Sequence, residues 1–136
     1  TMHALLLIAH GSRREASNNE IVALASTLQR IAASRFDLVL PAFLELAKPD
    51  IRTGVDQCVD AGATTIVAVP YFLAAGRHVA SDIPGELEKA QRKHPQVELR
   101  QSDYLGTHQS LPELLLALAL DQSDTESKPG SVQANG

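Results

Sequence analysis

The sequence predicts an α/β domain built on a four-stranded parallel sheet in the order 2-1-3-4, with helices on both faces. Four short apolar or β-branched runs alternate along the chain with four longer segments that carry apolar residues at helical spacing. Runs of this length, bounded by turn residues, are typical of buried parallel strands. The alternation favours right-handed crossovers, and the commonest small topology places the second and third strands on either side of the first.

The first third of the chain predicts two strands and a helix. The run His3–Ala9 is almost wholly apolar and ends abruptly at a histidine, so we expect it to be a central strand. Ser17, with a glutamate three residues later, has the form of a capping box and predicts a helix over Ser17–Ala33. Asp37–Phe43 predicts the second strand, at the sheet edge because Pro41 cannot donate a ladder hydrogen bond.

A second helix is expected from Pro49 to Gly62. Proline and Asp50 suit the first turn of a helix, and glycine suits the position after its end. The β-branched run Thr64–Val69 predicts the third strand, and a loop leads from it to His78.

The last third predicts two helices and a shorter strand. One helix is expected to begin near Asp82 and end near His94, followed by a strand at Val97–Gln101. A second capping box opens a helix over Ser110–Leu120. We therefore expect one domain over residues 1–120, followed by a polar segment, residues 121–136, with too little apolar content to order itself.

Composition narrows the function classes. The chain is 44% hydrophobic and 21% charged with a net charge of −4, which fits one globular domain and shows no basic face for nucleic acid. Its single cysteine, Cys58, excludes an internal disulfide and a cysteine metal cluster, so we expect a reducing compartment, the cytoplasm. The run Leu5–Ala9 is too short for a membrane span or a secretory signal.

Two histidines are the first candidates for chemistry. His10 ends the first strand and His78 follows the third, so both are expected at the carboxyl edge of the sheet, beside the crevice where ligands bind in such folds. Imidazole binds divalent metals and exchanges protons near neutral pH. The alternative is that His10 only caps its strand and His78 is merely solvated, and the residues alone leave both interpretations open.

Further polar residues are expected at the same edge. Glu45 follows the second strand and could complete a metal site or accept a proton, although an exposed charge before a helix has the same pattern. Ser12, Arg13, Arg14 and Arg77 stand beside glycines and could bind an anionic ligand, or form ordinary turns with solvated arginines. No glycine-rich nucleotide motif is present.

Five segments, taken in this order, carry a family resemblance over about residues 3–120. They are Ile8–Arg13 (Ile-Ala-His-Gly-Ser-Arg), Phe43–Glu45, Val69–Leu73, Gly76–His78 and Asp82–Pro84. Together they resemble the small sirohydrochlorin cobaltochelatase family. These proteins are class II tetrapyrrole chelatases, related to the sirohydrochlorin ferrochelatases.

The resemblance implies a flavodoxin-like, three-layer half domain that forms a homodimer. The implied reaction inserts a divalent metal into sirohydrochlorin, in cobalamin or sirohaem biosynthesis, with cobalt as the first expectation, iron next and nickel also in range. The family's catalytic and metal-binding residues map onto His10, His78 and Glu45. Beyond the substrate metal, no cofactor, nucleic acid or membrane is implied. The arginines and Tyr71 become candidates to hold the rim and face of the tetrapyrrole.

Two other functions remain to be weighed. A carrier that binds a metal or tetrapyrrole without catalysis would use the same histidines. A histidine phosphatase also has a strand that ends in His-Gly, but it requires an arginine directly before that histidine, and here the residue is Ala9.

Overall fold

The computed structural model describes residues 1–123 of the 136-residue chain. They fall into two compact units, residues 1–106 and a second unit that begins at Thr107. The strands are β1 (Met2–Ala9), β2 (Leu38–Phe43), β3 (Ala63–Pro70) and β4 (Glu98–Gln101). The helices are α1 (Glu15–Ile31), α2 (Ile51–Asp60), α3 (Ile83–Lys93) and, in the second unit, α4 (Leu111–Ser123).

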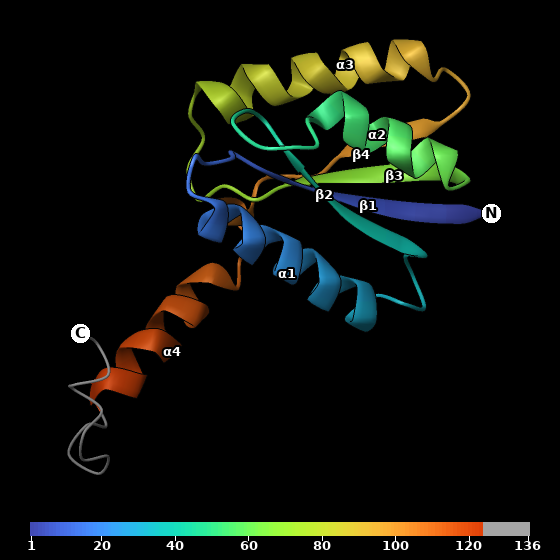
Figure 1. Cartoon of the computed structure of the whole chain (residues 1–136). Helices are drawn as coiled ribbons and strands as arrows, with labels where there is room; N and C mark the ends of the chain where they lie inside the picture. The colour runs from blue at the N-terminus through green and yellow to red at the C-terminus, as the bar shows by residue number, and fades with distance from the viewer. Residues whose placement is uncertain (124–136) are drawn as a thin grey trace. The chain divides into compact units, whose positions relative to one another are not determined.

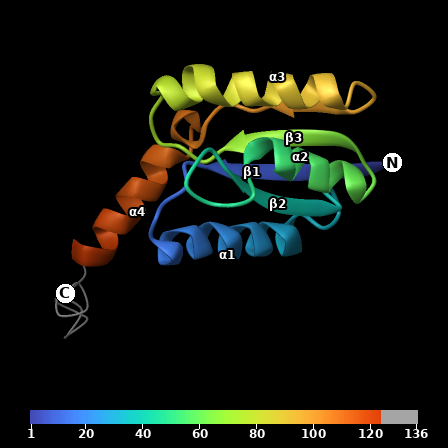
Figure 2. The same cartoon turned by 45° about the horizontal axis from the view of Figure 1, so that its top comes forward.

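The first unit is a three-layer α/β sandwich. Its strands are all parallel and lie in the order β2-β1-β3-β4, so the predicted topology is confirmed. Figures 1 and 2 show α1 on one face of this sheet and α2 with α3 on the other. β1 is flanked by strands on both sides, and its neighbours β2 and β3 lead to the two segments that border its carboxyl end.

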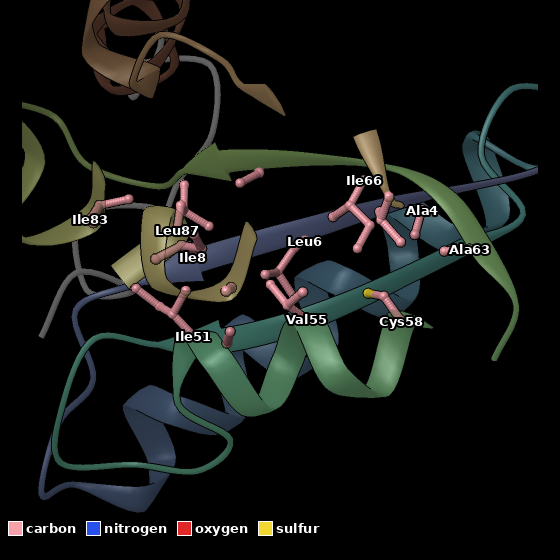
Figure 3. Close-up of a cluster of buried hydrophobic side chains, with 14 residues drawn as sticks. Ala4, Leu6, Ile8, Ile51, Val55, Cys58, Ala63, Ile66, Ile83 and Leu87 are labelled. Carbon is pink, nitrogen blue, oxygen red and sulfur yellow. The ribbon is translucent and has the colours of Figure 1, made fainter. Parts of the chain in front are cut away.

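The core is mostly aliphatic, with Phe43 as its largest fully buried side chain, and lies on both faces of the sheet. Alternate residues of β1 point to opposite sides, so that Leu6 and Ile8 meet α2 and α3 whereas Leu7 packs under α1. Figure 3 shows the larger cluster, in which Val55 and Cys58 of α2 face the strands. Cys58 is fully buried, and burial raises the pKa of its thiol to about 11.

The helix α1 begins earlier than predicted, and the capping box at Ser17 was wrong. The N-cap is Arg14, whose side chain makes no capping hydrogen bond. The turn before the helix is instead closed by Asn18, whose side chain accepts from the amide of Ser12 at 2.9 Å and donates to its carbonyl at 2.7 Å. A side chain inside the first turn therefore replaces the expected cap.

The start of α2 was predicted two residues too early. Asp50 is the N-cap and accepts from the amide of Thr53 at 2.8 Å, so Pro49 lies outside the helix rather than in its first turn. This hydrogen bond lowers the pKa of Asp50.

The later elements differ from the prediction in extent. A short π-helical turn, His78–Asp82, precedes α3, so His78 lies in regular structure rather than at the end of a loop. The helix α4 continues to Ser123, three residues beyond the predicted end, and the remainder of the expected polar segment lies outside the described residues. Within residues 1–123, no helix is long and apolar enough to cross a membrane.

An ionic contact ties α2 to the end of α3. Asp56 lies 2.6 Å from Nε2 of His94 and 2.9 Å from Nζ of Lys93, and these hydrogen bonds, that of His94 first, lower the pKa of Asp56. Because the folded pKa is lower than the unfolded one, the contact stabilises the fold fully above the unfolded pKa. That contribution is lost as the pH falls through the folded pKa.

We expect Asp56→Asn to lower the free energy of unfolding by about 1–2 kcal/mol at pH 7. Below about pH 4, where Asp56 becomes protonated, the variant and the unmodified protein should differ less in this free energy. Urea denaturation at both pH values measures this. Asp60→Asn, on the same helix but exposed, is the control and should change stability by less than about 0.5 kcal/mol. If the loss of stability in Asp56→Asn were the same at both pH values, the stabilising contact of the Asp56 carboxylate would be contradicted.

Candidate metal centre

Three predicted candidates come together at the carboxyl edge of the sheet. His10 follows β1, Glu45 follows β2, and His78 opens the turn after β3. Their ligating atoms, one from each side chain, all lie within 4.8 Å of one another. The side chains are between 41% and 50% exposed, so the group is open to an ion or a larger ligand. The expected crevice beside the end of β1 therefore holds the residues that the sequence assigned to it.

Backbone hydrogen bonds place Glu45 beside His10. The pairing of β1 with β2 continues past the ends of both strands, because the amide of Leu44 donates to the carbonyl of Ala9 at 2.9 Å and that of Glu45 to the carbonyl of His10 at 3.0 Å. The side chain of Glu45 then reaches Nε2 of His10, with Oε2 at 3.1 Å. The backbone of Glu45 is thus held against the end of β1 by a continuation of the strand pairing, and its side chain extends from there to His10.

This close approach depends on Gly11. Its φ is +95°, in the left-handed region that favours glycine. A Cβ atom at this position would lie 1.7 Å from the carbonyl oxygen of Glu45. Only glycine lets the chain turn away from His10 while Glu45 stays against it.

The hydrogen bonds of His10 fix which of its nitrogens can bind a metal. Nδ1 lies 2.9 Å from the carbonyl oxygen of Gly11, which can only accept, so Nδ1 carries the proton. In the neutral ring, Nε2 then presents its lone pair to the carboxylate of Glu45. Two acceptors 3.1 Å apart repel each other unless a proton or a metal ion lies between them, which is the arrangement of a cation site.

His78 has a parallel arrangement. Its Nδ1 lies 2.8 Å from Oδ2 of Asp82, four residues later on the π-helical turn. Its ring lies edge-on to that of His10, with centroids 4.8 Å apart and planes at 67°. The sequence indicated Asp82 as the start of a helix and as part of a segment that carries the family resemblance, but not as a partner of His78. The signal that could have found this contact is the spacing of four residues between a histidine and a carboxylate on one helical face.

Two imidazoles and one carboxylate are a good ligand set for first-row divalent metals. Imidazole suits iron, nickel and zinc, and the combination of two histidines with one carboxylate on one side of an open site is typical of Fe²⁺ centres. Metal–nitrogen distances of about 2.1 Å require ligand atoms somewhat closer than the widest separation here, so small side-chain rotations would complete the site. The donor set does not choose between cobalt and iron.

The residues predicted to hold an anionic ligand differ in their contacts. Arg13, Arg14 and Arg77 are exposed, and none forms an ion pair with any residue in the described part of the chain. Arg77 directly precedes His78, and Tyr71 is 40% exposed just after β3. Ser12 is partly used by the turn, because its Oγ accepts from the amide of Arg14 at 3.0 Å. These positions leave the arginines available to a ligand.

The chain matches the family model CbiX over residues 4–122. It is 33% identical over 115 residues to the sirohydrochlorin ferrochelatase of Priestia megaterium, covering 85% of this chain and 42% of that protein. It is 30% identical to the sirohydrochlorin cobaltochelatase of Sulfurisphaera tokodaii, covering 84% of this chain and 88% of that one. The chain thus spans less than half the length of the first relative and most of the second.

A solved structure shares the fold. The sirohydrochlorin chelatase SirB from Bacillus subtilis subspecies spizizenii, in complex with cobalt, superposes with a TM-score of 0.79 at 29% identity. The match covers 89% of this chain and 51% of SirB. The similarity therefore extends over nearly all of this chain and about half of the larger protein.

Proposed function

Because this chain belongs to the CbiX family, we propose that it is a metal chelatase, a lyase that inserts a divalent metal ion into sirohydrochlorin. Cobalt is the first expectation and iron the next, in cobalamin or sirohaem biosynthesis. The observation that carries the proposal is the group formed by His10, Glu45 and His78, whose ligating atoms lie within 4.8 Å of one another at an open sheet edge. No cofactor is proposed beyond the substrate metal.

The two histidines are proposed to hold the metal as it loses its water. In each ring Nδ1 is held by an oxygen atom, a carbonyl for His10 and a carboxylate for His78. The lone pair of each Nε2 is therefore the one that can bind a metal. Replacing water ligands one at a time by imidazole and carboxylate keeps the ion coordinated until the macrocycle's nitrogens take over.

Insertion also requires two protons to leave. The free macrocycle loses two pyrrole N–H protons, and the electron pairs left on those nitrogens bind the metal. Nε2 of His10 and the carboxylate of Glu45 face each other at 3.1 Å and can share a released proton between them. As the metal moves from the side chains to the ring, the same atoms become free to accept the protons. One group of residues can thus perform both steps.

The carboxylate-rich rim of sirohydrochlorin is proposed to bind the exposed arginines Arg13, Arg14 and Arg77. Guanidinium groups form paired hydrogen bonds with carboxylates, and these three have no ion-pair partner among residues 1–123. Tyr71 is placed to flank the face of the ring. We propose that the functional unit is residues 1–120 and that it acts in the cytoplasm, which fits one buried, unpaired cysteine.

A homodimer is proposed for the assembled enzyme. The helix α4 carries three successive leucines, Leu114–Leu116, followed by Leu118 and Leu120, so that it is apolar on all its sides. A helix that is hydrophobic all round is normally buried against other elements. Relatives such as the Priestia ferrochelatase have more than twice the matched length in one chain.

Replacing Leu114 and Leu118 together by asparagine should convert the dimer to a monomer, as measured by size-exclusion chromatography with light scattering. The control is Leu5→Val, a conservative change in β1 that should lower stability slightly and leave the dimer intact. A monomeric unmodified protein would overturn the dimer proposal without affecting the chelatase proposal.

The proposed activity is tested anaerobically by mixing the purified protein with sirohydrochlorin and Co²⁺, Fe²⁺ or Ni²⁺ and following the visible spectrum against a control without protein. A metal-dependent acceleration supports the chelatase and ranks its metals. Spectral shifts on binding without acceleration for any metal would overturn the enzyme and indicate a tetrapyrrole carrier.

A further inference from the structure

We infer that Asp82 is a positioning residue: its carboxylate holds Nδ1–H of His78 and so directs the Nε2 lone pair of that ring toward His10 and Glu45. The inference rests on the proposed metal centre and extends it to a residue outside the ligand group. Carboxylates that accept from the second nitrogen of a metal-binding histidine fix its tautomer and orientation and raise its basicity.

The contact itself is short and local. Oδ2 of Asp82 lies 2.8 Å from Nδ1 of His78, and the two side chains are similarly exposed, at 40% and 41%. They lie four residues apart on the π-helical turn His78–Asp82, where the amide of Ile83 donates to the carbonyl of His78. Single π turns within helices are frequently found at functional sites. The turn brings the carboxylate under the ring that it holds.

Asp82 is not needed to cap a helix. It ends the π-helical turn and leads directly into α3, with a backbone that is already helical at φ −68° and ψ −44°. The amide of Ile83, the first residue of α3, is already bonded to the carbonyl of His78, and the side chain of Asp82 makes no capping hydrogen bond. Here the carboxylate is directed to His78 instead.

Asp82 is also distinct from the ligands. The three residues whose atoms lie within 4.8 Å of one another are His10, Glu45 and His78, and Asp82 is outside that group. Its effect on a metal must therefore pass through His78. The two histidines are then held alike, His10 by the carbonyl of Gly11 and His78 by a carboxylate.

The first test is the affinity for Co²⁺ alone, measured by calorimetry or by the visible spectrum of the bound ion. Asp82→Asn keeps the size of the side chain but lets the amide donate to Nδ1, so both tautomers of His78 become possible. We expect 10–100-fold weaker binding, the usual cost of losing such a partner. Asp82→Glu, which restores a carboxylate, should recover part of the loss. Glu88→Gln removes a carboxylate that pairs only with Arg92 at 2.9 Å in the described residues, and should bind as the unmodified protein does.

The second test separates positioning from other roles. In a His78→Ala background, adding Asp82→Asn should cause no further loss of Co²⁺ affinity, because residues that act through one another are not additive. A further 10-fold loss in the double variant would overturn the inference, since Asp82 would then act on the metal independently.

The third test needs no metal. Long-range ¹H–¹⁵N correlation spectra of the metal-free protein should show His78 mainly as the Nδ1–H tautomer, and a larger Nε2–H fraction in Asp82→Asn. An unchanged tautomer, or unchanged Co²⁺ affinity in that variant, would contradict the inference. If the unmodified protein binds no Co²⁺, the proposed metal centre fails, whereas the tautomer measurement still decides what Asp82 does.

Discussion

Replacing His10 by alanine is expected to reduce the rate of metal insertion by about 10²–10³-fold. The substitution removes Nε2 of His10, which faces Glu45 at 3.1 Å. Its lone pair is proposed both to bind the metal and to accept a proton. The fold should survive, because His10 is half-exposed and lies after the end of β1. Initial rates of the anaerobic spectral assay, at saturating metal and tetrapyrrole, measure the effect.

The matched control for this variant is His3→Ala. His3 is an exposed histidine near the start of β1, at the end of the strand opposite to His10 and away from the carboxyl edge. Its removal should leave the rate within a factor of two or so of the unmodified protein, as expected of most surface substitutions. An unchanged rate for His10→Ala, in protein shown to be folded, would remove His10 from the reaction.

The second large effect is expected for Gly11→Ala, which should lower the free energy of unfolding by about 2–4 kcal/mol. Alanine is strained at a φ of +95°, and its Cβ would lie 1.7 Å from the carbonyl oxygen of Glu45, so the backbone on one side must move. The movement also separates Glu45 from His10, so metal insertion should fall with stability. Urea denaturation and the spectral assay follow the two losses.

Gly85→Ala is the control for this substitution. Gly85 lies within α3, and a Cβ there would meet no atom within 4 Å. Alanine is the better helix former, so this change should stabilise the protein by about 0.5–1 kcal/mol. If Gly11→Ala were as stable as Gly85→Ala, the close approach at the sheet edge would not constrain the chain in solution.

Much of the fold could be predicted from the sequence because the strands are short and nearly continuous in apolar residues. The run that ends at His10 is too apolar for an exposed edge of the sheet, so it was predicted to be a central strand. Pro41, which cannot donate a ladder hydrogen bond, predicted the second strand at an edge. The capping box at Ser17 was wrong for a physical reason: several polar residues in a row can each bind a turn, and here the local hydrogen bonds with the backbone of Ser12 are made by Asn18.

The three residues of the candidate site could be predicted from the sequence, but the hydrogen bonds that hold their side chains could not. The ends of β1 and β2 and the π-helical turn that follows β3 bring His10, Glu45 and His78 together at one edge of the sheet. The partner of His78 was missed, because an aspartate before Ile-Pro has the pattern of an ordinary helix start and the segment around His78 was expected to be a loop, where a spacing of four residues has no meaning. Only the π-helical turn reveals that its side chain is used elsewhere.

The way in which the sheet edge is assembled links the metal to the folding equilibrium. The three proposed ligands are far apart in the sequence and are brought together by hydrogen bonds between strand ends, such as those from Glu45 to His10 and from Tyr71 to Ile8, at 3.0 and 2.7 Å. The unfolded chain therefore holds no preformed site, and an ion that binds only the native state stabilises it by mass action. At a free metal concentration 100 times the Kd, the gain is about 2.7 kcal/mol. The supply of the metal would then influence how much of the protein is folded as well as how fast it works.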